Sequence, residues 1–415
     1  MKYGINTIDD FNLKEKTVLA RLDLNSPFDS TGLSLADTTR IDAALPTIEE
    51  LQAKGAKLVI LTHQGGDLEH HNFKPTSIHA KHIEDSLNLP VKYIDDVCGP
   101  EARKTIKNLS AGDIIMLDNV RYMAEEMTLF ETKLKLSPAE QTKTIVVRKL
   151  APLADVYICD AFAAAHRSQP TLVGFPQLLP SGMGRLFEKE YGILSEIINS
   201  PKKPCVFLLG GSKIEDAFSM MPKALSEGIA DNILAAGLLA QVFYLSEGLD
   251  LGKASIEIIR AKKLDEYIDK AQGILKKYRD RIILPKDFSY IDNKRMEIDL
   301  SELPAKLPIV DIGSKSIHIF KEKLSNAATV FINGPAGVFE KEESEIGTKK
   351  LWNYIASHDS FSVIGGGDSI AAANKYGISD KFSYVCTGGG AMVRFLSGEE
   401  LPVVKALKEA AIKFK

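Results

Sequence analysis

The 415-residue sequence contains only four cysteines, and no two of them are close in the chain. Their spacing matches neither a disulfide scaffold nor the paired ligands of a zinc site, so we expect a reducing compartment. The four are Cys98, Cys159, Cys205 and Cys386.

Long apolar runs are also missing. The longest, Ile233–Leu245, is too short to cross a bilayer and contains Gln241. The N-terminal segment MKYGINTIDDFNLKEK has acidic residues where a signal peptide would have its apolar centre. We therefore expect a cytoplasmic protein with no membrane partner.

Neither sign of charge is in large excess. The chain has 52 Lys and Arg against 55 Asp and Glu, a formal net charge of −3, which gives no indication of nucleic-acid binding. Hydrophobic residues make up 45% and charged residues 26%, which is typical of a globular protein. A chain of this length has room for two or three domains with proper cores.

Strand and helix patterns alternate along the chain. Short apolar runs such as Lys57–Thr62 predict buried strands, and amphipathic segments such as Asp37–Lys54 predict helices between them. This alternation predicts an α/β fold with parallel sheets.

The pattern divides into two halves of similar size. A proline-rich boundary precedes a long amphipathic helix within residues 183–200. We expect an N-terminal α/β lobe over residues 1–175 and a C-terminal α/β lobe over 201–400. The last helical segment, 402–415, can pack on either lobe.

Four strands of the second half end in glycine-rich turns. Such turns bring bare N–H groups against a ligand, and a following helix adds its positive end. Ligands of open α/β sheets bind at the carboxyl edge, so the turns predict one nucleotide-phosphate site. None completes the G-x-G-x-x-G fingerprint of a dinucleotide site. The turns are Gly210–Lys213, Asn333–Gly337, Gly365–Ser369 and Thr387–Gly390.

Two charged residues strengthen this interpretation. Asp368 adds a carboxylate where a metal that bridges phosphates would need one, and Lys213 adds a positive charge. A plain strand-to-helix turn explains any one of these segments, but not four in one sheet together with Lys213.

In the first half, polar and basic side chains stand where predicted strands end. Arginine suits phosphate and carboxylate because it bonds in pairs and keeps its charge. A solvated surface explains any one arginine, but the repetition predicts a site for a small anion. The residues are Arg21, Asp23, Asn25, Arg40, His63, Asn119, Arg121, His166 and Arg167.

A cluster of histidines offers a metal site as an alternative. His79 and His82 are three residues apart on a predicted helix, without a carboxylate or cysteine at ligand spacing. The pattern favours a solvated loop and helix face over a metal site. The cluster is His63, His70, His71, His79 and His82.

Taken in order, the motifs of the chain resemble those of the phosphoglycerate kinase family almost from end to end. In the first half they are VLARLDLNSP (18–27), THQG (62–65), LDNVRY (117–122) and DAFAAAHR (160–167). In the second half they are LGGSKIED (209–216), LPKDF (284–288), NGPAGVFE (333–340), GGGDS (365–369) and TGGGA (387–391). The compact region 125–150 and the phrase AFAAAHRSQP are similar to the archaeal branch of the family.

The resemblance implies a fold and an activity. The fold is two Rossmann-like parallel-sheet lobes joined by a long helix and a hinge, in a monomer whose C-terminal helix returns to the N-terminal lobe. The activity is reversible phosphoryl transfer from 1,3-bisphosphoglycerate to ADP, giving 3-phosphoglycerate and ATP, a step of glycolysis and gluconeogenesis. Magnesium enters with the nucleotide as Mg-ADP or Mg-ATP.

The resemblance also implies site residues. Those for 3-phosphoglycerate are Arg21, Asp23, Asn25, Arg40, His63, Arg121, His166 and Arg167. Those for the nucleotide are Gly211, Ser212, Lys213, Gly237, Pro335, Val338, Glu340, Gly366, Gly367, Asp368 and Ser369. Glu340 is expected at the ribose hydroxyls and Asp368 on the magnesium ion.

A reaction of this kind needs no general base, because the attacking carboxylate is already ionised near neutral pH. Catalysis is then positioning and charge neutralisation. We expect Arg40 to bridge the reacting carboxylate and the phosphoryl group, and Lys213 to follow the transferred group. Backbone N–H groups at Gly367 and Gly390 are expected to meet the transition-state oxygens.

Three positions depart from the family pattern. Gly66 stands where an arginine is usual, Ala217 where many members have a second lysine, and Arg394 where a glutamate is common. Lys223 is a candidate replacement for the second lysine. These gaps leave a second hypothesis open, a catalytically weakened relative that binds nucleotide as a sensor or scaffold. A third, an NAD-dependent dehydrogenase, lacks its glycine fingerprint.

Overall fold

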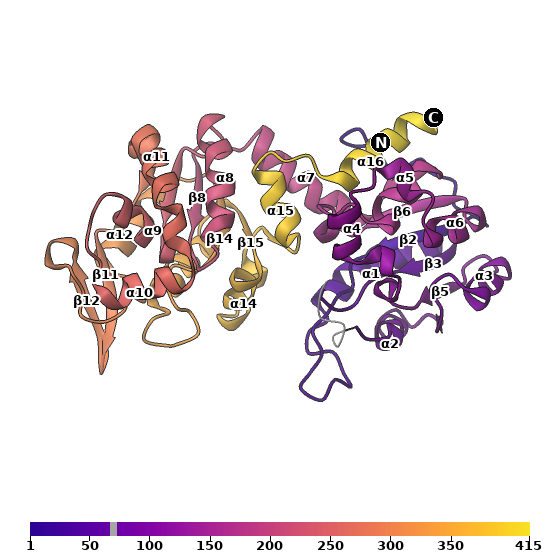
Figure 1. Ribbon diagram of the computed structural model, residues 1–415, viewed down its shortest axis with the longest axis horizontal. Helices are drawn as coiled ribbons and strands as arrows, with labels where there is room; N and C mark the ends of the chain where they lie inside the picture. Colours follow the sequence, from indigo (N-terminus) through magenta and orange to yellow (C-terminus); the bar gives the residue numbers. More distant parts are fainter. Residues whose placement is uncertain (67–72) are drawn as a thin grey trace. The chain divides into compact units, whose positions relative to one another are not determined.

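The computed structural model describes residues 1–66 and 73–415, which form two compact units (Figure 1). The N-terminal unit consists of Met1–Ile193 together with Glu400–Lys415, and the C-terminal unit of Leu194–Glu399. Each unit has its own sheet, so each is described by itself.

The sheet of the N-terminal unit has seven strands in the order β1-β7-β6-β2-β3-β5-β4, and all its pairings are parallel. The central strands are short apolar runs that are almost wholly buried, as in sheets covered on both faces. The strands are β1 Asn6–Thr7, β2 Thr17–Leu22, β3 Lys57–Leu61, β4 Val91–Ile94, β5 Ile114–Leu117, β6 Val156–Asp160 and β7 Ser181–Met183.

Helices that bury apolar side chains accompany this sheet. Ile41, Ile48 and Leu51 of the first helix are fully buried in the same core cluster as Val18 and Ile60 of the sheet. The helices are α1 Thr39–Ala53, α2 Ser77–Leu87, α3 Pro100–Lys107, α4 Thr128–Leu134, α5 Pro138–Gln141 and α6 Ile145–Leu150.

Two further helices lie where the chain passes from one unit to the other or just after it. α7, Arg185–Asn199, contributes residues to both units, and the sequence predicted its extent closely. α16, Pro402–Lys413, belongs to the N-terminal unit: the Val403 N–H donates to the Ala165 carbonyl at 3.2 Å. The Lys413 ammonium donates to the Gln177 carbonyl at 2.7 Å.

The main sheet of the C-terminal unit has six parallel strands in the order β10-β9-β8-β14-β15-β16. From β8, the next strands in the chain, β9 and β10, are added on one side, and β14, β15 and β16 are added on the other side. The direction of the strand order therefore reverses between β8 and β14, which is a topological switch point. The strands are β8 Cys205–Leu209, β9 Asn232–Ala235, β10 Ile282–Ile283, β14 Thr329–Asn333, β15 Phe361–Gly365 and β16 Tyr384–Cys386.

The helices of this unit follow the strands of the sheet. Phe320 and Trp352 are fully buried in the cluster that contains Leu208 and Ile332 of the sheet. The helices are α8 Ile214–Ser226, α9 Gly237–Ser246, α10 Lys253–Ala261, α11 Ile268–Tyr278, α12 Ser314–Leu324, α13 Ile346–Ala356, α14 Gly367–Lys375 and α15 Gly389–Leu396.

A three-stranded antiparallel sheet in the C-terminal unit was not expected from the sequence. β11, Asp287–Asp292, pairs with β12, Lys294–Asp299, and with β13, Asp311–Ile312. The apolar pattern of the sequence favours Ile309–Ile312 as a further strand of the parallel series; this is wrong, because the strand there is Asp311–Ile312 and it pairs antiparallel with β11. The segment KRMEID is mostly charged and only partly buried, and its two apolar residues, Met296 and Ile298, are too few to indicate a strand.

The two parallel sheets, each with its own helices, confirm the α/β prediction. Among the described residues, none of the helices combines the length and the apolar character that a bilayer crossing requires.

Candidate active site

The turns after β8 and β14 are in direct contact at the switch point of the C-terminal unit. The Gly210 N–H donates to the Asn333 carbonyl at 2.9 Å, and the Gly211 N–H to the Pro335 carbonyl at 2.7 Å. Gly334 has φ +89°, and a Cβ there would collide with the Gly210 carbonyl. Glycine is required because two backbones cross at this point.

The turn from β15 into α14 joins the same cluster. Gly366 has φ +92°, and a Cβ on it would lie 2.9 Å from the Asn333 amide nitrogen. The Gly334 N–H donates to Ser369 Oγ at 2.8 Å, and Ser369 is buried. The Ser369 hydroxyl therefore ties two turns together.

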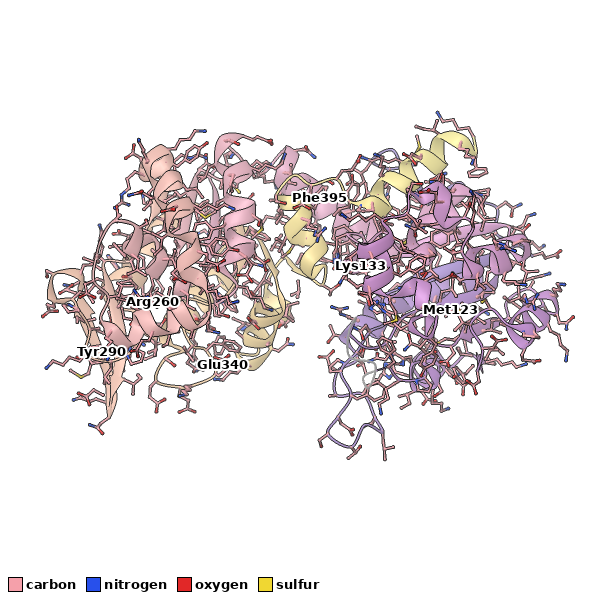
Figure 2. All side chains as sticks on the ribbon, viewed as in Figure 1. Met123, Lys133, Arg260, Tyr290, Glu340 and Phe395 are labelled. Carbon is pink, nitrogen blue, oxygen red and sulfur yellow. The ribbon has the colours of Figure 1, made fainter. Side chains whose placement is uncertain are left out.

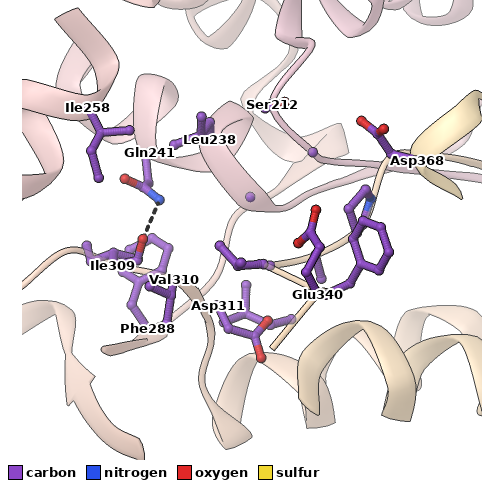
Figure 3. Close-up of a pocket in the computed structure, with 18 of the residues that line it drawn as sticks. Ser212, Leu238, Gln241, Ile258, Phe288, Ile309, Val310, Asp311, Glu340 and Asp368 are labelled. Carbon is purple, nitrogen blue, oxygen red and sulfur yellow. Dashed lines mark hydrogen bonds between the residues drawn. The ribbon is translucent and has the colours of Figure 1, made fainter. Parts of the chain in front are cut away.

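Two adjoining hollows open along these turns. The first is a cavity of about 290 Å³ with apolar walls from Leu238, Ile258, Phe288 and Ile309, together with Val338 (Figure 3). The second is smaller and is lined chiefly by the glycine turns. Gly211, Ser212 and Asp368 line both.

The structure brings together the residues that the sequence predicted for the nucleotide. The first cavity is lined by Gly211, Ser212, Gly237, Pro335, Val338, Glu340 and Asp368. The second hollow is lined by Lys213, Gly366, Gly367, Ser369 and Gly390, besides Gly211, Ser212 and Asp368. Glu340 is among the labelled side chains of the C-terminal unit in Figure 2.

Several residues of the cavity wall were missed by the sequence analysis. Leu238 and Gln241 lie in the first turns of α9, and the Gln241 amide contacts the Ile309 carbonyl at 3.5 Å (Figure 3). Phe288 belongs to the LPKDF motif, which was noted without a role. Apolar wall residues carry no chemical signature, so only the fold reveals them.

The donor set around Asp368 fits a magnesium ion that arrives with phosphates. In the described parts of the chain, no group of three or more His, Cys, Asp and Glu is placed to hold a metal. Asp368 and Asp216 line the second hollow beside bare glycine backbone. Mg²⁺ commonly takes one or two carboxylates and completes its shell with phosphate oxygens and water.

In the N-terminal unit, Arg21 of β2 lies beneath the predicted anion site, with only 1% of its surface exposed. Its Nε donates to Thr171 Oγ1 at 3.1 Å, its Nη1 to the Leu22 carbonyl, and its Nη2 lies 3.2 Å from His63 Nδ1. The guanidinium is thus held on three sides by the protein itself.

Thr171 links Arg21 to the fully buried Glu126. The Thr171 hydroxyl donates to Glu126 Oε2 at 2.8 Å, and the Thr171 N–H to Oε1 at 2.7 Å. Burial raises the pKa of Glu126, although the charge of Arg21 and the hydrogen bonds from Thr171 oppose the rise. This network balances the buried charge of Arg21.

Asp23 joins Arg40 to the same cluster. Arg40 Nη1 donates to Asp23 Oδ2 at 2.7 Å, and His63 Nδ1 lies 3.9 Å from Asp23 Oδ1. Burial alone would raise the pKa of Asp23, but the charges of Arg40 and Arg21 and a hydrogen bond from the Asn25 N–H help to outweigh it, and the pKa is lowered. Burial lowers the pKa of His63 to about 3, so the ring is neutral at physiological pH.

Two asparagines of the predicted site hold loops together. Asn25 Oδ1 accepts from the Gly65 N–H at 2.9 Å. Asn119 Oδ1 accepts from the N–H groups of Gln64 and Arg121, each at 3.0 Å. These bonds fix the turns after β2, β3 and β5 relative to one another.

The remaining predicted residues lie at the ends of β5 and β6. Arg121 is buried, and its Nη1 donates to the Glu126 carbonyl at 2.9 Å. His166 and Arg167 follow the turn after β6, and Arg167 Nη1 lies 3.8 Å from Glu131 Oε2.

The histidine cluster differs from the expected solvated helix face. His79 on α2 is fully buried, and its Nε2 lies 2.9 Å from Gln64 Oε1. Burial lowers the pKa of His79 to about 4. His70 and His71 lie outside the described residues.

The structure also shows the surroundings of the three positions that depart from the family pattern. Around Gly66 a Cβ would meet open space, and Ala217 is buried on α8. Lys223 lies in the last turn of α8, where it pairs with Glu227 at 2.8 Å, and it lines neither hollow. As the structure stands, Lys223 therefore does not reach the hollow that Lys213 lines. The Arg394 guanidinium is half exposed and lies 3.8 Å from Glu399.

Comparisons with known proteins agree with the motifs. The family described as phosphoglycerate kinase matches residues 8–399. The phosphoglycerate kinase of Methanobacterium bryantii is 44% identical over 414 residues, covering 100% of this chain and 99% of the relative. That of Methanothermus fervidus is 45% identical over 405 residues, covering 97% of each.

Solved structures agree as well. The crystal structure of phosphoglycerate kinase from Pyrococcus horikoshii has a TM-score of 0.88 at 40% identity, covering 98% of this chain and 99% of that one. The enzyme from Coxiella burnetii has a TM-score of 0.82 at 29% identity, covering 98% and 100%. Nothing in these comparisons supports a catalytically weakened relative, and the chain belongs to the phosphoglycerate kinase family.

Proposed function

We propose that this chain catalyses reversible phosphoryl transfer from 1,3-bisphosphoglycerate to ADP, with the nucleotide on the C-terminal unit and 3-phosphoglycerate on the N-terminal unit. The observation that carries the proposal is the meeting of the glycine turns, Lys213 and Asp368 around two adjoining hollows. One hollow is apolar enough for a base, and the other offers backbone N–H groups to phosphates.

The nucleotide lies along both hollows. Its base packs between the side chains of the first cavity, and the Glu340 carboxylate accepts from the ribose hydroxyls. Its phosphates reach the second hollow, where the start of α14 adds the positive end of a helix. Asp368 holds Mg²⁺, which when bound neutralises phosphate charge; Gly366 and Ser369 border the phosphates.

The N-terminal unit binds the acidic substrate through its arginines and histidines. Arg40 is the most accessible of the cluster around Asp23, with 37% of its side chain exposed. His63, being neutral, serves as a hydrogen-bond donor rather than as a charge. Arg21 is the positioning residue beneath them, while Arg121, His166 and Arg167 contribute from neighbouring strand ends, and Asp23 and Asn25 orient the cluster.

The chemical step needs charge neutralisation and no general base. A carboxylate oxygen of 3-phosphoglycerate attacks the γ-phosphorus of ATP, the bond to the bridging oxygen breaks, and ADP leaves. Arg40 bridges the attacking carboxylate and the phosphoryl group, and Lys213 stays with the phosphoryl group as it moves. N–H groups at Gly367 and Gly390 stabilise its oxygens.

The two substrates have to meet, so the units must close during the reaction. We place the movement at α7, whose N-terminal end is anchored in the N-terminal unit by Arg185 bonds to Asp9 and Glu50. The protein acts as a monomer in the cytoplasm; its four free cysteines, all buried, are compatible with that compartment. Small-angle scattering that shows no compaction with both substrates bound would contradict the closure.

The decisive experiment is a turnover assay of the purified protein with 3-phosphoglycerate and Mg-ATP. Consumption of the bisphosphoglycerate product is coupled to NADH oxidation. We expect robust turnover that depends on both substrates. Nucleotide binding without turnover would overturn the proposal, and Gly66→Arg would then test whether the missing arginine is the cause.

A further inference from the structure

Arg295 occupies an unusual place in the C-terminal unit. It comes from β12, the outer strand of the antiparallel sheet, whose lysine neighbour Lys294 is exposed. Only 12% of the Arg295 side chain is exposed. Figure 2 shows this hairpin at Tyr290, in β11.

We propose that Arg295 is a positioning residue for the nucleotide, because its ion pair with Asp311 holds the segment Val338–Gly347 against the first cavity. The proposal rests on the proposed function, in which Val338 and Glu340 of this segment contact the nucleoside.

The guanidinium of Arg295 joins three separate parts of the chain. Nη1 donates to Asp311 Oδ2 at 2.9 Å and to the Glu343 carbonyl at 3.1 Å. Nη2 donates to the Ile312 carbonyl at 2.7 Å, and Nε lies 3.5 Å from Glu297 Oε1. A planar fork with five donors can make these contacts together, whereas a lysine cannot.

Asp311, the buried partner of Arg295, connects the ion pair to the first cavity because it lines that cavity. It is 2% exposed, it lines the first cavity with Glu340 (Figure 3), and its Oδ2 also accepts from the Gly347 N–H at 2.7 Å. A Cβ on Gly337 would lie 2.5 Å from Asp311 Oδ1. Gly337, which directly precedes the segment, and Gly347, which ends it, are thus both packed on the Asp311 carboxylate.

The segment between these ends is held by polar contacts, one of which is independent of Asp311: the Lys375 ammonium donates to the Phe339 carbonyl at 2.8 Å. Residues 341–343 are exposed, so apolar burial does not hold them. The Val338 N–H donates to the Val310 carbonyl at 2.8 Å, and Ser344 Oγ donates to the Val338 carbonyl at 2.7 Å. The bond from Arg295 to the Glu343 carbonyl is the tie that links the exposed stretch to Asp311.

Removing Arg295 leaves the Asp311 carboxylate buried without its cation, which favours movement of the strand and of the segment packed on it. The phosphate-binding turns keep their own contacts. The loss therefore falls on the affinity for the nucleotide and spares the chemical step and 3-phosphoglycerate.

The test compares full-length wild type, Arg295→Met and the exposed neighbour variant Lys294→Met. We expect Arg295→Met to raise the Kd for ADP by calorimetry, and the KM for ATP, about tenfold. We expect kcat and the KM for 3-phosphoglycerate to stay within about twofold, and Lys294→Met to match the wild type. The Kd for ADP of Arg295→Lys should lie between those of wild type and Arg295→Met, because lysine keeps the positive charge but lacks the planar fork of donors.

Unchanged ADP affinity in folded Arg295→Met would overturn the inference, even if its melting temperature fell. If that variant does not fold, Arg295→Met with Asp311→Asn removes the buried charge as well. The bond from Arg295 to the Glu343 carbonyl is still lost, so the affinity for ADP should still fall. If the wild-type protein binds no ADP, the proposed function and this inference both fail. If the wild type binds ADP and Arg295→Met binds it equally well, only this inference fails.

Discussion

Arg21 Nη2 and His63 Nδ1 lie 3.2 Å apart in the interior of the N-terminal unit. A guanidinium can only donate, so Nδ1 must accept, and the neutral ring carries its proton on Nε2. The pKa of His63, lowered by burial to about 3, agrees with this assignment.

We predict that His63 stays neutral, with its proton on Nε2, down to about pH 4. Its ¹⁵N chemical shifts should show that tautomer unchanged between pH 7.5 and 5. Arg21→Met removes both the donor and a repelling charge, so the pKa of His63 should rise. A His63 ring that is protonated at pH 6 in the wild type would contradict the assignment.

A second prediction concerns acid stability and His79. Its folded pKa of about 4 lies below the ordinary value of about 6.5, so between these values the unfolded state binds more protons. The free energy of unfolding should therefore fall as the pH drops from 6.5 to 4, by up to about 1.4 kcal/mol per pH unit. Above pH 6.5 the stabilisation is fully present.

The measurement is urea unfolding of wild type and His79→Gln at pH 7.5, 6 and 5. Burial raises the pKa of Asp160 and of Asp311 to about 6, and raised acids act with the opposite sign. Both acids, like His63, are present in both proteins and cancel in the comparison. Parallel pH profiles of the two proteins would show that His79 is not responsible.

Arg40→Ala should lower kcat about 10²- to 10³-fold, since its charge acts on the reacting groups. The KM for 3-phosphoglycerate should change less. Arg40→Lys keeps a point charge but not the fork that reaches Asp23, and should recover part of the rate. Near-normal turnover of Arg40→Ala at saturating substrates would remove Arg40 from the chemical step.

Lys213 and Lys223 offer a matched pair near the two ends of α8. Lys213→Ala should lower kcat/KM about 10²- to 10³-fold, because a charge at the moving phosphoryl group is lost. Lys223→Ala should leave turnover unchanged, because Lys223 pairs with Glu227 and lines neither hollow. Equal losses in steady-state kinetics would contradict the assignment.

Asp368 and Asp216 both line the second hollow, but only Asp368 is proposed to hold the metal. Asp368→Asn should raise the Mg²⁺ concentration needed for half-maximal activity about tenfold. Asp216→Asn should shift it little. A larger shift for Asp216→Asn in the magnesium titration would move the ion to that carboxylate, and chelation with EDTA should abolish turnover in all forms.

The sequence predicted the parts of the site that depend on local chemistry. Gly366 and Gly334 stand where positive φ or close approach requires glycine, and Lys213 and Asp368 follow such turns directly. Parallel strands place their carboxyl ends at one edge, so strand prediction was enough to bring these residues together.

What the sequence could not predict depends on contacts between distant segments. Arg21 meets Thr171 across 150 positions, and the sequence, which predicted Arg21 as a substrate-binding residue, contained no sign that its guanidinium is buried by this contact. Arg295 stands in a charged run that is typical of a solvated surface, and only the antiparallel pairing of β11 with β12 and β13 brings it to Asp311. His79 has neighbours of mixed polarity, so its burial had no local signal.

The position of α16 has a consequence for how the chain folds as it is made. The C-terminal unit is a continuous stretch, so it is complete once residue 399 has left the ribosome. The N-terminal unit, although synthesised first, lacks α16 until residues 400–415 emerge, and until then β7 and the short helix at Phe175–Gln177 miss the helix that packs on them. The N-terminal unit is therefore completed after the C-terminal unit, although most of it is synthesised first.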